Sequence, residues 1–345
     1  MKNIVIAVDA MGGDYAPNNV LQAVALSAVR HPYVSFLIFG HQNLIEPIIS
    51  KMPELVDKYQ IIHTDSVISM EEKPSVAIRQ KNTSMLLAIE AVRDGLAHGI
   101  ISGGNTGALM ALSKLRLRMI EGINRPSIAS LWPTLHGECV VTDLGANLTA
   151  SVDDLVDFTI MGAEYARIIF DKPMPLVGLL NVGTEEMKGN DTLKSAAAIL
   201  SEKQAEYGFK YHGFIEGSDI CKGTVDVVVT DGFTGNIALK TAEGVAHLIS
   251  SYLKGSLKST LISKIGAFLA KKSLMHFKDK VDPRKVNGGV FLGLNGIAVK
   301  SHGGADQIAY AAALDLAIDL ASGDIINAIY NKIAQRKQVQ EKINN

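Results

Sequence analysis

Short apolar runs rich in β-branched residues alternate along this chain with longer segments in which apolar residues recur every three or four positions. The short runs are apolar on both faces. This is typical of strands in a sheet that helices cover on both sides. We therefore predict strands at Asn3–Val8, Val34–Phe39, Gly99–Ser102, Ser127–Trp132, Glu138–Thr142, Leu176–Val182 and Val225–Thr230.

The longer segments have the apolar spacing of helices. A repeated order of strand, glycine-rich turn and helix is typical of a mostly parallel α/β sheet with right-handed crossovers. No linker rich in Pro, Gly or Ser interrupts this order, so we predict a single α/β domain over residues 1–345. The predicted helices are Ser75–Arg93, Asn105–Arg118, Asp153–Phe170, Asp191–Tyr207, Asn236–Leu253, Ala305–Leu320 and Asp324–Asn345.

The segment at residues 253–280 departs from this pattern. It contains seven lysines and a single acid, Asp279. A helix with a wide apolar face and a lysine-rich remainder suits a membrane interface or a partner subunit. The alternative is a surface helix of the fold itself, whose lysines extend over buried apolar groups. We predict a protruding amphipathic helical segment, because five apolar residues share one side: Leu257, Leu261, Ile265, Phe268 and Leu269.

Composition and charge narrow the class of protein. Hydrophobic residues make up 47% of the 345 residues and charged residues 20%, which indicates a globular chain with a large core. The formal net charge of −1 offers no basic field for nucleic acid. Cys139 and Cys221 form no CxxC pair, so neither a disulfide framework nor a zinc site is indicated. No apolar stretch is long enough for a signal peptide or a membrane span, so we expect a cytoplasmic protein.

Polar, glycine-containing turns follow the predicted strands, where open α/β sheets bind ligands. Backbone N–H groups in such turns, with a helix N-terminus behind them, bind anions. Each turn alone is also explained by the preference for Gly, Asn and Asp before helices, but together they predict an anion site. The turns are Asp9–Asp14, Ser102–Gly107, Asp143–Asn147, Asn181–Asn190 and Thr230–Asn236, with a similar one at Lys300–Gly304.

Several catalytic motifs are absent from the chain: the GxGxxG fingerprint, the GxxxxGK[ST] P-loop, the GxSxG elbow and HExxH. His302 and Asp306 form an HxxxD spacing, but two residues match this pattern often by chance. What remains is a lysine, Lys188, with amides, hydroxyls and many backbone donors, a set that suits a small oxyanion. No nucleophile is paired with a base, which favours direct attack between two bound substrates.

At these motifs the sequence closely resembles the phosphate acyltransferase (acyl-ACP:phosphate acyltransferase) family of bacterial phospholipid synthesis. The similarity runs in the family's order across essentially the whole chain. Small departures are Gly103, where the family usually has Ala, and residues 286–291, which lack the usual tyrosine. The matching stretches are VDAMGGDYAP (8–17), KPSVAIRQK (73–81), ISGGNTGALMA (101–111), RPSIA (125–129), TDLGAN (142–147), LLNVGTEEMKGND (179–191), FIEGSDI (214–220), VVTDGFTGNIALKTAEG (228–244) and DPRKVNGGVFLGLNGIAVKSHG (282–303).

The resemblance implies a three-layer α/β/α sandwich like that of isopropylmalate dehydrogenases and phosphotransacetylases, assembled as a homodimer. It implies transfer of a long-chain fatty acyl group from acyl-ACP to inorganic phosphate, without cofactor or metal, giving acyl phosphate for phosphatidic acid and phospholipid synthesis. The family binds the inner face of the cell membrane peripherally through a helical protrusion near the dimer interface, which residues 253–280 resemble. The glycerol-3-phosphate acyltransferase that uses acyl phosphate downstream is then a candidate partner.

In the family, the proposed catalytic residues are the lysine of the GTEExKGN-like motif and the asparagine of DGFTGN, which correspond to Lys188 and Asn236. Lys188 would hold the phosphate, and Asn236 would stabilise the oxyanion of the thioester carbonyl. A salt bridge to Glu185 or Glu186 is the alternative for that lysine. The thiol leaves with little help because its pKa is about 8.5. Further predicted substrate- or phosphate-binding residues are Asp9, Gly12, Gly13, Asp14, Gly104, Asn105, Thr106, Gly107, Asn147, Thr184, Glu185, Asp231, Gly232, Thr234, Gly235, Lys300 and His302.

Acyl carrier proteins are acidic, so a basic docking patch is expected near the site. Lys114 with Arg118 is one candidate, and the lysines of 254–272 are another. Two other functions stay open from the residues alone: a phosphotransacetylase-type enzyme acting on short acyl-CoA, and a non-enzymatic membrane-associated scaffold. A decarboxylating dehydrogenase is more distant, because no metal-binding carboxylate cluster is evident.

Overall fold

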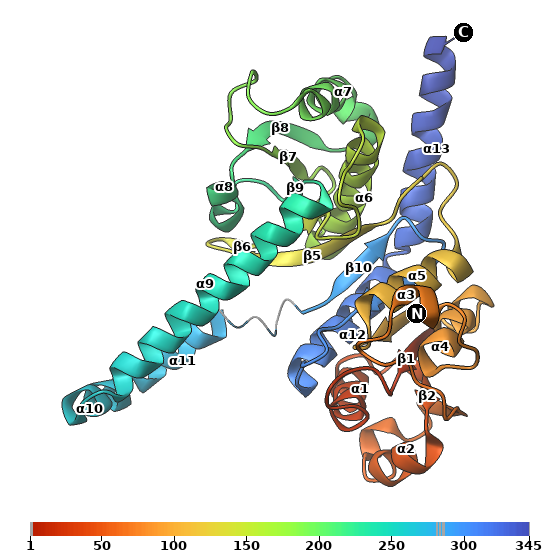
Figure 1. The fold of residues 1–345 in the computed structure, drawn as a ribbon, viewed down its shortest axis with the longest axis vertical. Coiled ribbons are helices and arrows are strands. Elements are labelled where there is room, and N and C mark those ends of the chain that lie inside the picture. Colours follow the sequence, from red (N-terminus) through yellow and green to blue (C-terminus); the bar gives the residue numbers. More distant parts are fainter. Residues whose placement is uncertain (1–2, 281, 283, 285–286, 345) are drawn as a thin grey trace.

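The computed structural model describes residues 3–280, 282, 284 and 287–344. Its eleven described strands form one sheet in the order β3-β2-β1-β4-β11-β10-β5-β6-β9-β7-β8 (Figure 1). The strands are β1 (Ile4–Asp9), β2 (Val34–Gly40), β3 (Tyr59–His63), β4 (Gly99–Ser102), β5 (Ser127–Thr134), β6 (Gly137–Thr142), β7 (Leu176–Leu180), β8 (Lys210–Ile215), β9 (Val227–Val229), β10 (Gly289–Leu292) and β11 (Ile297–Lys300).

Seven of the ten neighbouring strand pairs are parallel, so the predicted mostly parallel sheet is confirmed. The parallel pairs form two blocks. The first block is β3-β2-β1-β4-β11, and the second is β6-β9-β7-β8. Strands β10 and β5 lie between them and pair antiparallel with their neighbours. Three antiparallel pairs in a row give the two blocks opposite strand directions.

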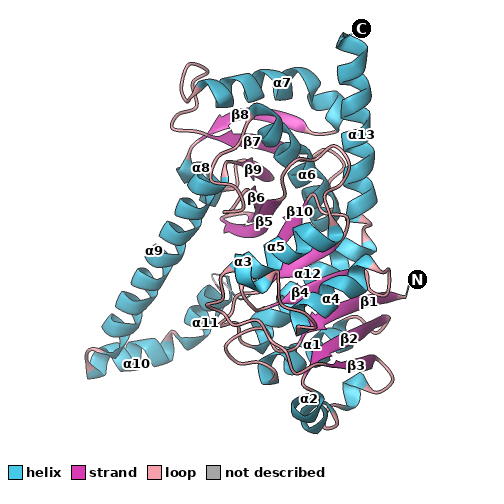
Figure 2. Ribbon diagram, turned by 45° about the vertical axis from the view of Figure 1, so that its right-hand side comes forward, coloured by secondary structure: helices cyan, strands magenta, loops and turns pink. Residues whose placement is uncertain are grey.

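Helices cover both faces of the sheet, which confirms the predicted three-layer sandwich (Figure 2). One face is covered by α1 and α12 over the first block and by α6, α7 and α13 over the second. The other face is covered by α4 and α5, and by α8 and α9. The helices are α1 (Asn18–Arg30), α2 (Gln42–Ile49), η1 (Pro53–Leu55), α3 (Pro74–Ala77), α4 (Ser84–Arg93), α5 (Thr106–Leu117), α6 (Val152–Phe170), α7 (Asp191–Tyr207), α8 (Gly217–Lys222), α9 (Gly232–Lys258), α10 (Leu261–Leu269), α11 (Lys271–Lys280), α12 (Gln307–Ser322) and α13 (Ile325–Asn344).

The apolar pattern does not predict four of the strands. Strands β3 and β8 are the two edges of the sheet, and most of their residues are half-buried or exposed. They lack the continuous apolar run that identifies a central strand. Strands β10 and β11 have four residues each, which is too short for periodicity to identify. Helices α1, α2 and α8 are also absent from the prediction.

The predicted helix Ser75–Arg93 is wrong as a single element. The structure has a short helix α3, then a break, then α4. Asn82 has a positive φ of 56°, which ends any continuous helix there. Thr83 then starts α4, because its hydroxyl oxygen accepts a hydrogen bond from the Leu86 N–H at 3.2 Å.

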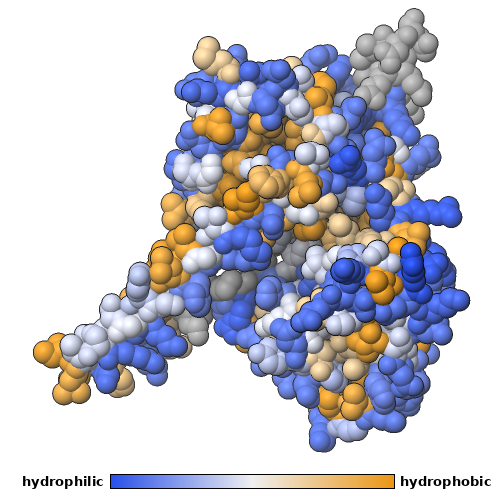
Figure 3. Space-filling model, in the orientation of Figure 1, coloured by the Kyte–Doolittle hydropathy of each residue, from blue (hydrophilic) through white to orange (hydrophobic). Residues whose placement is uncertain are grey.

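Helices α9, α10 and α11 project from the sheet as an arm (Figure 1). Only Gly232 and Gly235 are buried in α9, and no residue of α10 is buried. The predicted amphipathic segment 253–280 thus consists of the end of α9 followed by α10 and α11. Hydrophobic residues are exposed at its tip, at the lower left of Figure 3; Phe268 and Leu269, for example, are 74% and 78% exposed. In the described part of the chain, no helix has the length and apolar character to cross a bilayer.

Candidate functional site

The predicted turns fall into two groups, at the carboxyl ends of the two parallel blocks. Strands β1, β4 and β11 end level with one another, because Asp9 pairs with Ser102 and Ser102 with Lys300. Strands β6, β9 and β7 end level in the same way. We call the resulting groups the first turn cluster (residues 9–14, 102–107 and 300–304) and the second turn cluster (residues 143–147, 181–190 and 230–236).

The first turn cluster is organised around the buried carboxylate of Asp9, which is 1% exposed. The hydroxyls of Ser84 and Ser102 each donate to it at 2.6 Å, and the Met11 N–H donates at 3.3 Å. Burial raises the pKa of Asp9, and the serine hydrogen bonds oppose that rise. A Cβ on Gly12 would lie 2.6 Å from the Asp9 carboxylate, so this position requires glycine.

Lys300 supplies the positive charge of the first turn cluster. Its amine donates to the carbonyl oxygens of Gly103, at 3.3 Å, and Ser301. Burial lowers the pKa of Lys300 to about 8, while the carboxylates of Asp14 and Asp9 favour its charged form. A buried lysine with a depressed pKa is a frequent feature of functional sites.

Other predicted residues of the first turn cluster make hydrogen bonds within the protein. The N–H of Gly104 donates to the Ser102 hydroxyl at 3.0 Å, and that of Asp14 donates to the Gly303 carbonyl at 2.9 Å. The ring Nδ1 of His302 accepts from the Gly304 N–H at 3.1 Å. Asp306 caps α12 instead of contacting His302, so the HxxxD spacing forms no hydrogen-bonded pair. Gly13 adopts the positive φ that glycine allows, and Thr106 and Gly107 begin α5.

Asn105 connects the first turn cluster to the flap, which we define as residues 65–82 between β3 and α4. Its side-chain oxygen caps α5 by accepting from the Ala108 N–H at 3.0 Å. Its amide nitrogen donates to the carbonyl oxygens of Met70, at 2.7 Å, and Glu72, at 2.8 Å. Asn105, which was predicted to bind an anion, therefore holds the flap over the turn at residues 102–107.

The second turn cluster is organised around Asp143, which is fully buried. One carboxylate oxygen accepts from the N–H groups of Ile128, Gly145 and Ala146 at 2.9–3.1 Å. The other accepts from the backbone and side-chain nitrogens of Asn147, both at 2.8 Å. Burial raises the pKa of Asp143, and these hydrogen bonds oppose it. Asn147 is thus part of the scaffold.

The start of α9 packs directly against this turn. Asp231 caps the helix by accepting from the Thr234 N–H at 2.8 Å, and the Thr234 hydroxyl also donates to it. A Cβ on Gly232 would lie 2.5 Å from the Asn147 carbonyl oxygen, and one on Gly235 would overlap the Asp143 carbonyl oxygen. Both glycines are therefore required by the close approach of the two backbones.

The polar groups of Asn236 and Lys188 are free. Both side chains are exposed, and among the described residues neither makes a hydrogen bond or an ion pair. Neither Glu185 nor Glu186, the alternative partners considered for Lys188, forms a salt bridge with its amine. The backbone N–H of Lys188 donates to the Glu185 carbonyl oxygen at 3.0 Å. Thr184 and Glu185 are exposed in the same loop. The second turn cluster therefore presents an amide and an ammonium group.

No hydrogen bond or ion pair between described residues joins the two clusters. Sequence reasoning did not select Ser84 or Asp143 as site residues. Asp143 comes directly after a strand and shortly before a glycine, as Asp9 does. This shared position in the sequence could have identified Asp143 as a site residue. No local signal identifies Ser84, which reaches Asp9 across 75 positions of the chain.

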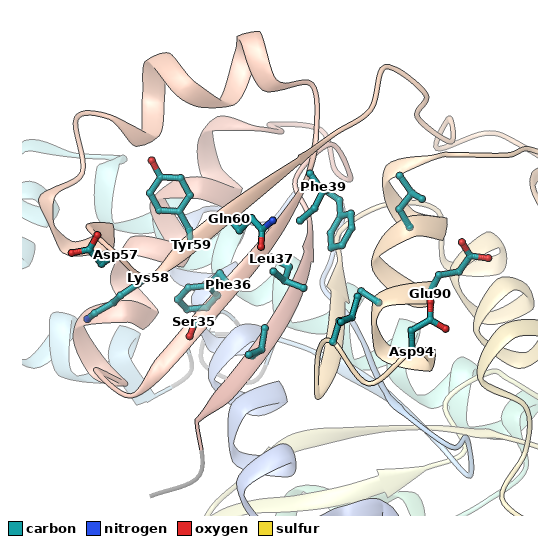
Figure 4. A pocket seen from close by; sticks show the side chains of 15 residues that line it. Ser35, Phe36, Leu37, Phe39, Asp57, Lys58, Tyr59, Gln60, Glu90 and Asp94 are labelled. Carbon is teal, nitrogen blue, oxygen red and sulfur yellow. The ribbon is translucent and has the colours of Figure 1, made fainter.

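A cavity of about 570 Å³ lies apart from both clusters, between β2, β3 and α4 (Figure 4). Its wall includes Phe36 and Leu37, with Glu90 and Asp94 on α4 and just after it. None of the predicted site residues lines it. Across the described ranges, His, Cys, Asp and Glu side chains form no group of three or more that could hold a metal ion.

Comparison with known proteins gives a consistent family and fold. A family model described as "Fatty acid synthesis protein" matches residues 4–328. A phosphate acyltransferase of Parvibaculum lavamentivorans is 50% identical over 330 residues, covering 95% of this chain and 91% of that protein. One from Paramagnetospirillum magneticum is 51% identical over 320 residues, covering 92% and 91%. The EutD phosphotransacetylase of Staphylococcus aureus has a similar fold, with a TM-score of 0.62 at 14% identity over 93% of this chain and 94% of that one.

Proposed function

We propose that this chain, which belongs to the phosphate acyltransferase family and is an acyltransferase with phosphate as acceptor, takes a long-chain fatty acyl group from acyl carrier protein. The product is an acyl phosphate for phosphatidic acid and phospholipid synthesis. The observation that supports the chemistry best is the second turn cluster. It presents the free side chains of Lys188 and Asn236 on a scaffold in which Asp143, Asn147 and Asp231 are hydrogen-bonded.

In the proposed reaction, a phosphate oxygen attacks the thioester carbonyl carbon, and the thiolate of the carrier leaves. The C–S bond breaks as the C–O bond forms, and the acyl phosphate is released. Phosphate is already an anion near neutral pH, so it needs positioning more than a strong base. Lys188 binds the phosphate and offsets its charge. The Asn236 amide donates to the carbonyl oxygen as negative charge develops there.

The first turn cluster has a supporting part in this proposal. Lys300 is a half-buried cation at the carboxyl end of the first block, next to the N-terminus of α5. An anionic group of the substrate placed there would face both a positive charge and a helix N-terminus. Because Lys300 already donates to two carbonyl oxygens, we assign it to holding substrate rather than to bond formation.

We assign the arm to the predicted homodimer and to peripheral contact with the inner face of the cell membrane. Its exposed hydrophobic residues lie along α9, at the tip in α10 and in α11. The tip combines residues such as Ile262 and Phe268 with Lys264, which is the composition of a helix at a lipid interface. A protein at that surface can pass acyl phosphate to the downstream glycerol-3-phosphate acyltransferase.

The experiment that tests this function measures free carrier thiol released from palmitoyl-ACP, with and without inorganic phosphate, together with acyl phosphate formed. We expect thiol release that requires phosphate and equals acyl phosphate in amount. Activity on acetyl-CoA with none on palmitoyl-ACP would favour a short-chain phosphotransacetylase. Inactivity with both donors would favour a membrane-associated scaffold.

A further inference from the structure

We propose that the exposed face formed by α5 and the flap is the surface on which an acidic carrier protein docks. This inference rests on the proposed function, since it names where the protein part of acyl-ACP binds. The face is distinguished by positively charged side chains from two segments that are distant in sequence: Lys73, Arg79 and Lys81 from the flap, and Lys114 and Arg118 from α5 and its end.

The flap and α5 form one packed unit. The Asn105 amide, at the start of α5, donates to two carbonyl oxygens of the flap. Pro74, the first residue of α3, packs so closely on α5 that a Cβ on Gly107 would lie 2.7 Å from its ring. The flap is closed on itself by the Gln80 side chain, which donates to the Glu72 carboxylate at 3.1 Å. The positive charges of the flap are therefore held beside α5.

Helix geometry puts the two groups of charges on one side of the molecule. Gly107, Ala111 and Lys114 follow one another at intervals of four and three residues, so they lie along one face of α5. Pro74 contacts the first of these residues, and Lys114 continues the same face toward the far end of the helix. Arg118 is the first residue after the helix and has a positive φ of 63°. The face thus runs from the flap along the length of α5.

The five cations are not neutralised by neighbours. All five are exposed, and within the described chain none forms an ion pair or a side-chain hydrogen bond. By contrast, Arg116, on the same helix, lies 3.4 Å from Glu90. The flap carries three acids, Asp65 beside His41, the exposed Glu71, and Glu72, which accepts a hydrogen bond from the uncharged Gln80; they are fewer than the five cations. The face therefore has an excess of positive charge that suits an acidic protein.

This face also adjoins the first turn cluster, to which the proposed function assigns a part in holding substrate. Helix α5 begins in the first turn cluster, and Lys114 is only about 12 Å along the helix from Thr106, at 1.5 Å per residue. Figures 1 and 2 both place α3 and α5 on the side of the first block that faces the second block, and the surface is mostly hydrophilic there (Figure 3).

The test uses two charge-reversal variants of the full chain, Lys114→Glu/Arg118→Glu on α5 and Lys73→Glu/Arg79→Glu on the flap. Lys210→Glu, an exposed lysine on β8 at the far edge of the sheet, is the matched control. For each protein, KM is measured at low and high salt with palmitoyl-ACP and with palmitoyl-pantetheine, which lacks the carrier protein. Binding of fluorescently labelled holo-ACP is measured in parallel, because it does not depend on turnover.

We expect both variants to raise the KM for palmitoyl-ACP, relative to the KM for palmitoyl-pantetheine, on the order of tenfold at low salt and less at high salt. Binding of holo-ACP should weaken in parallel. An unchanged ratio and unchanged binding in both variants would overturn the docking face, while turnover of palmitoyl-ACP by the wild type would leave the proposed function standing. Wild-type protein that neither binds nor uses the carrier overturns both. Loss of binding to phosphatidylglycerol vesicles with an unchanged KM ratio would assign the face to a lipid surface.

Discussion

The two turn clusters use the same element, a buried aspartate at the carboxyl end of a strand, to support different kinds of surface. Asp9 is held mainly by the hydroxyls of Ser84 and Ser102, which can rotate. Asp143 is held entirely by N–H donors, four of them on the backbone or side chain of the turn that follows it. The first arrangement tolerates changes of protonation, whereas the second fixes the shape of the turn.

This difference decides what each cluster presents. In the first cluster Asn105, Gly104 and Lys300 are engaged in internal hydrogen bonds, and the flap lies over the turn. In the second cluster the scaffold is satisfied internally, so the side chains of Lys188 and Asn236 remain free. We therefore expect substitutions in the second cluster to affect bond formation, and those in the first to affect mainly substrate affinity.

The largest expected effect comes from truncating the free side chains of the second cluster. Lys188→Ala and Asn236→Ala should each lower kcat by about a hundred- to a thousandfold, because each removes a donor to charge on the reacting groups. Lys188→Ala should also weaken the dependence on phosphate. The measurement is acyl phosphate formation over a range of phosphate concentrations.

Replacing the lysine of the first cluster with alanine tests whether the two clusters differ in this way. Lys300→Ala should raise the KM for phosphate or for the acyl donor more than it lowers kcat. Lys240→Ala, one turn beyond Asn236 on α9 and paired with Glu243, is the control. If Lys300→Ala lost more kcat than Lys188→Ala, the reacting groups would belong to the first cluster.

The next effect concerns the close contact between α9 and the turn of Asp143. Gly235→Ala places a methyl group against the Asp143 carbonyl oxygen, so it should lower the free energy of unfolding by about 3 kcal/mol and displace Asn236. Gly244→Ala on the same helix meets no atom within 4 Å and should be neutral or slightly stabilising. Urea unfolding of the two variants decides this; equal stabilities would mean that the contact is not tight in solution.

Much of this architecture could be predicted from the sequence, because central strands and glycine-rich turns leave strong local signals. Residues Val34–Phe39 are apolar except for Ser35, and β2 covers them. The edge strand Tyr59–His63 is only partly buried, so its residues have no such pattern. The turns were found, but their division into two clusters follows from strand order, which periodicity does not contain.

Individual roles within the turns were harder to predict. Asn105 and Asn236 both follow glycines near the start of a helix, yet one caps its helix and holds the flap while the other is free. Their difference depends on partners more than thirty residues away, such as Met70, which no local pattern reveals.

A smaller effect on stability is expected when Asp143 and Asp9 are each replaced by asparagine. Asp143→Asn puts an NH₂ group where only N–H donors point, whichever way the amide is turned, so one donor contact becomes repulsive. Asp9→Asn is milder, because the Ser102 hydroxyl can rotate to accept. We expect a loss of about 2 kcal/mol for Asp143→Asn and less than about 1 kcal/mol for Asp9→Asn. Similar losses in urea unfolding would show that the hydroxyls of the first cluster are as fixed as the amides of the second.

The smallest effect is the pH dependence that Lys300 gives to stability. Burial lowers the pKa of Lys300 from 10.5 to about 8, so between these values the unfolded chain binds a proton that the folded chain does not. Stability from this group therefore rises with pH across that window and is constant below it. From pH 8 to 10 the wild type should therefore gain stability relative to Lys300→Met. The gain in unfolding free energy is on the order of 1 kcal/mol, allowing for the partial exposure of the side chain. Lys210→Met gives the background for an exposed lysine. A difference that stays flat or falls over this range would mean that the amine of Lys300 remains charged in the folded protein, held by Asp9 and Asp14.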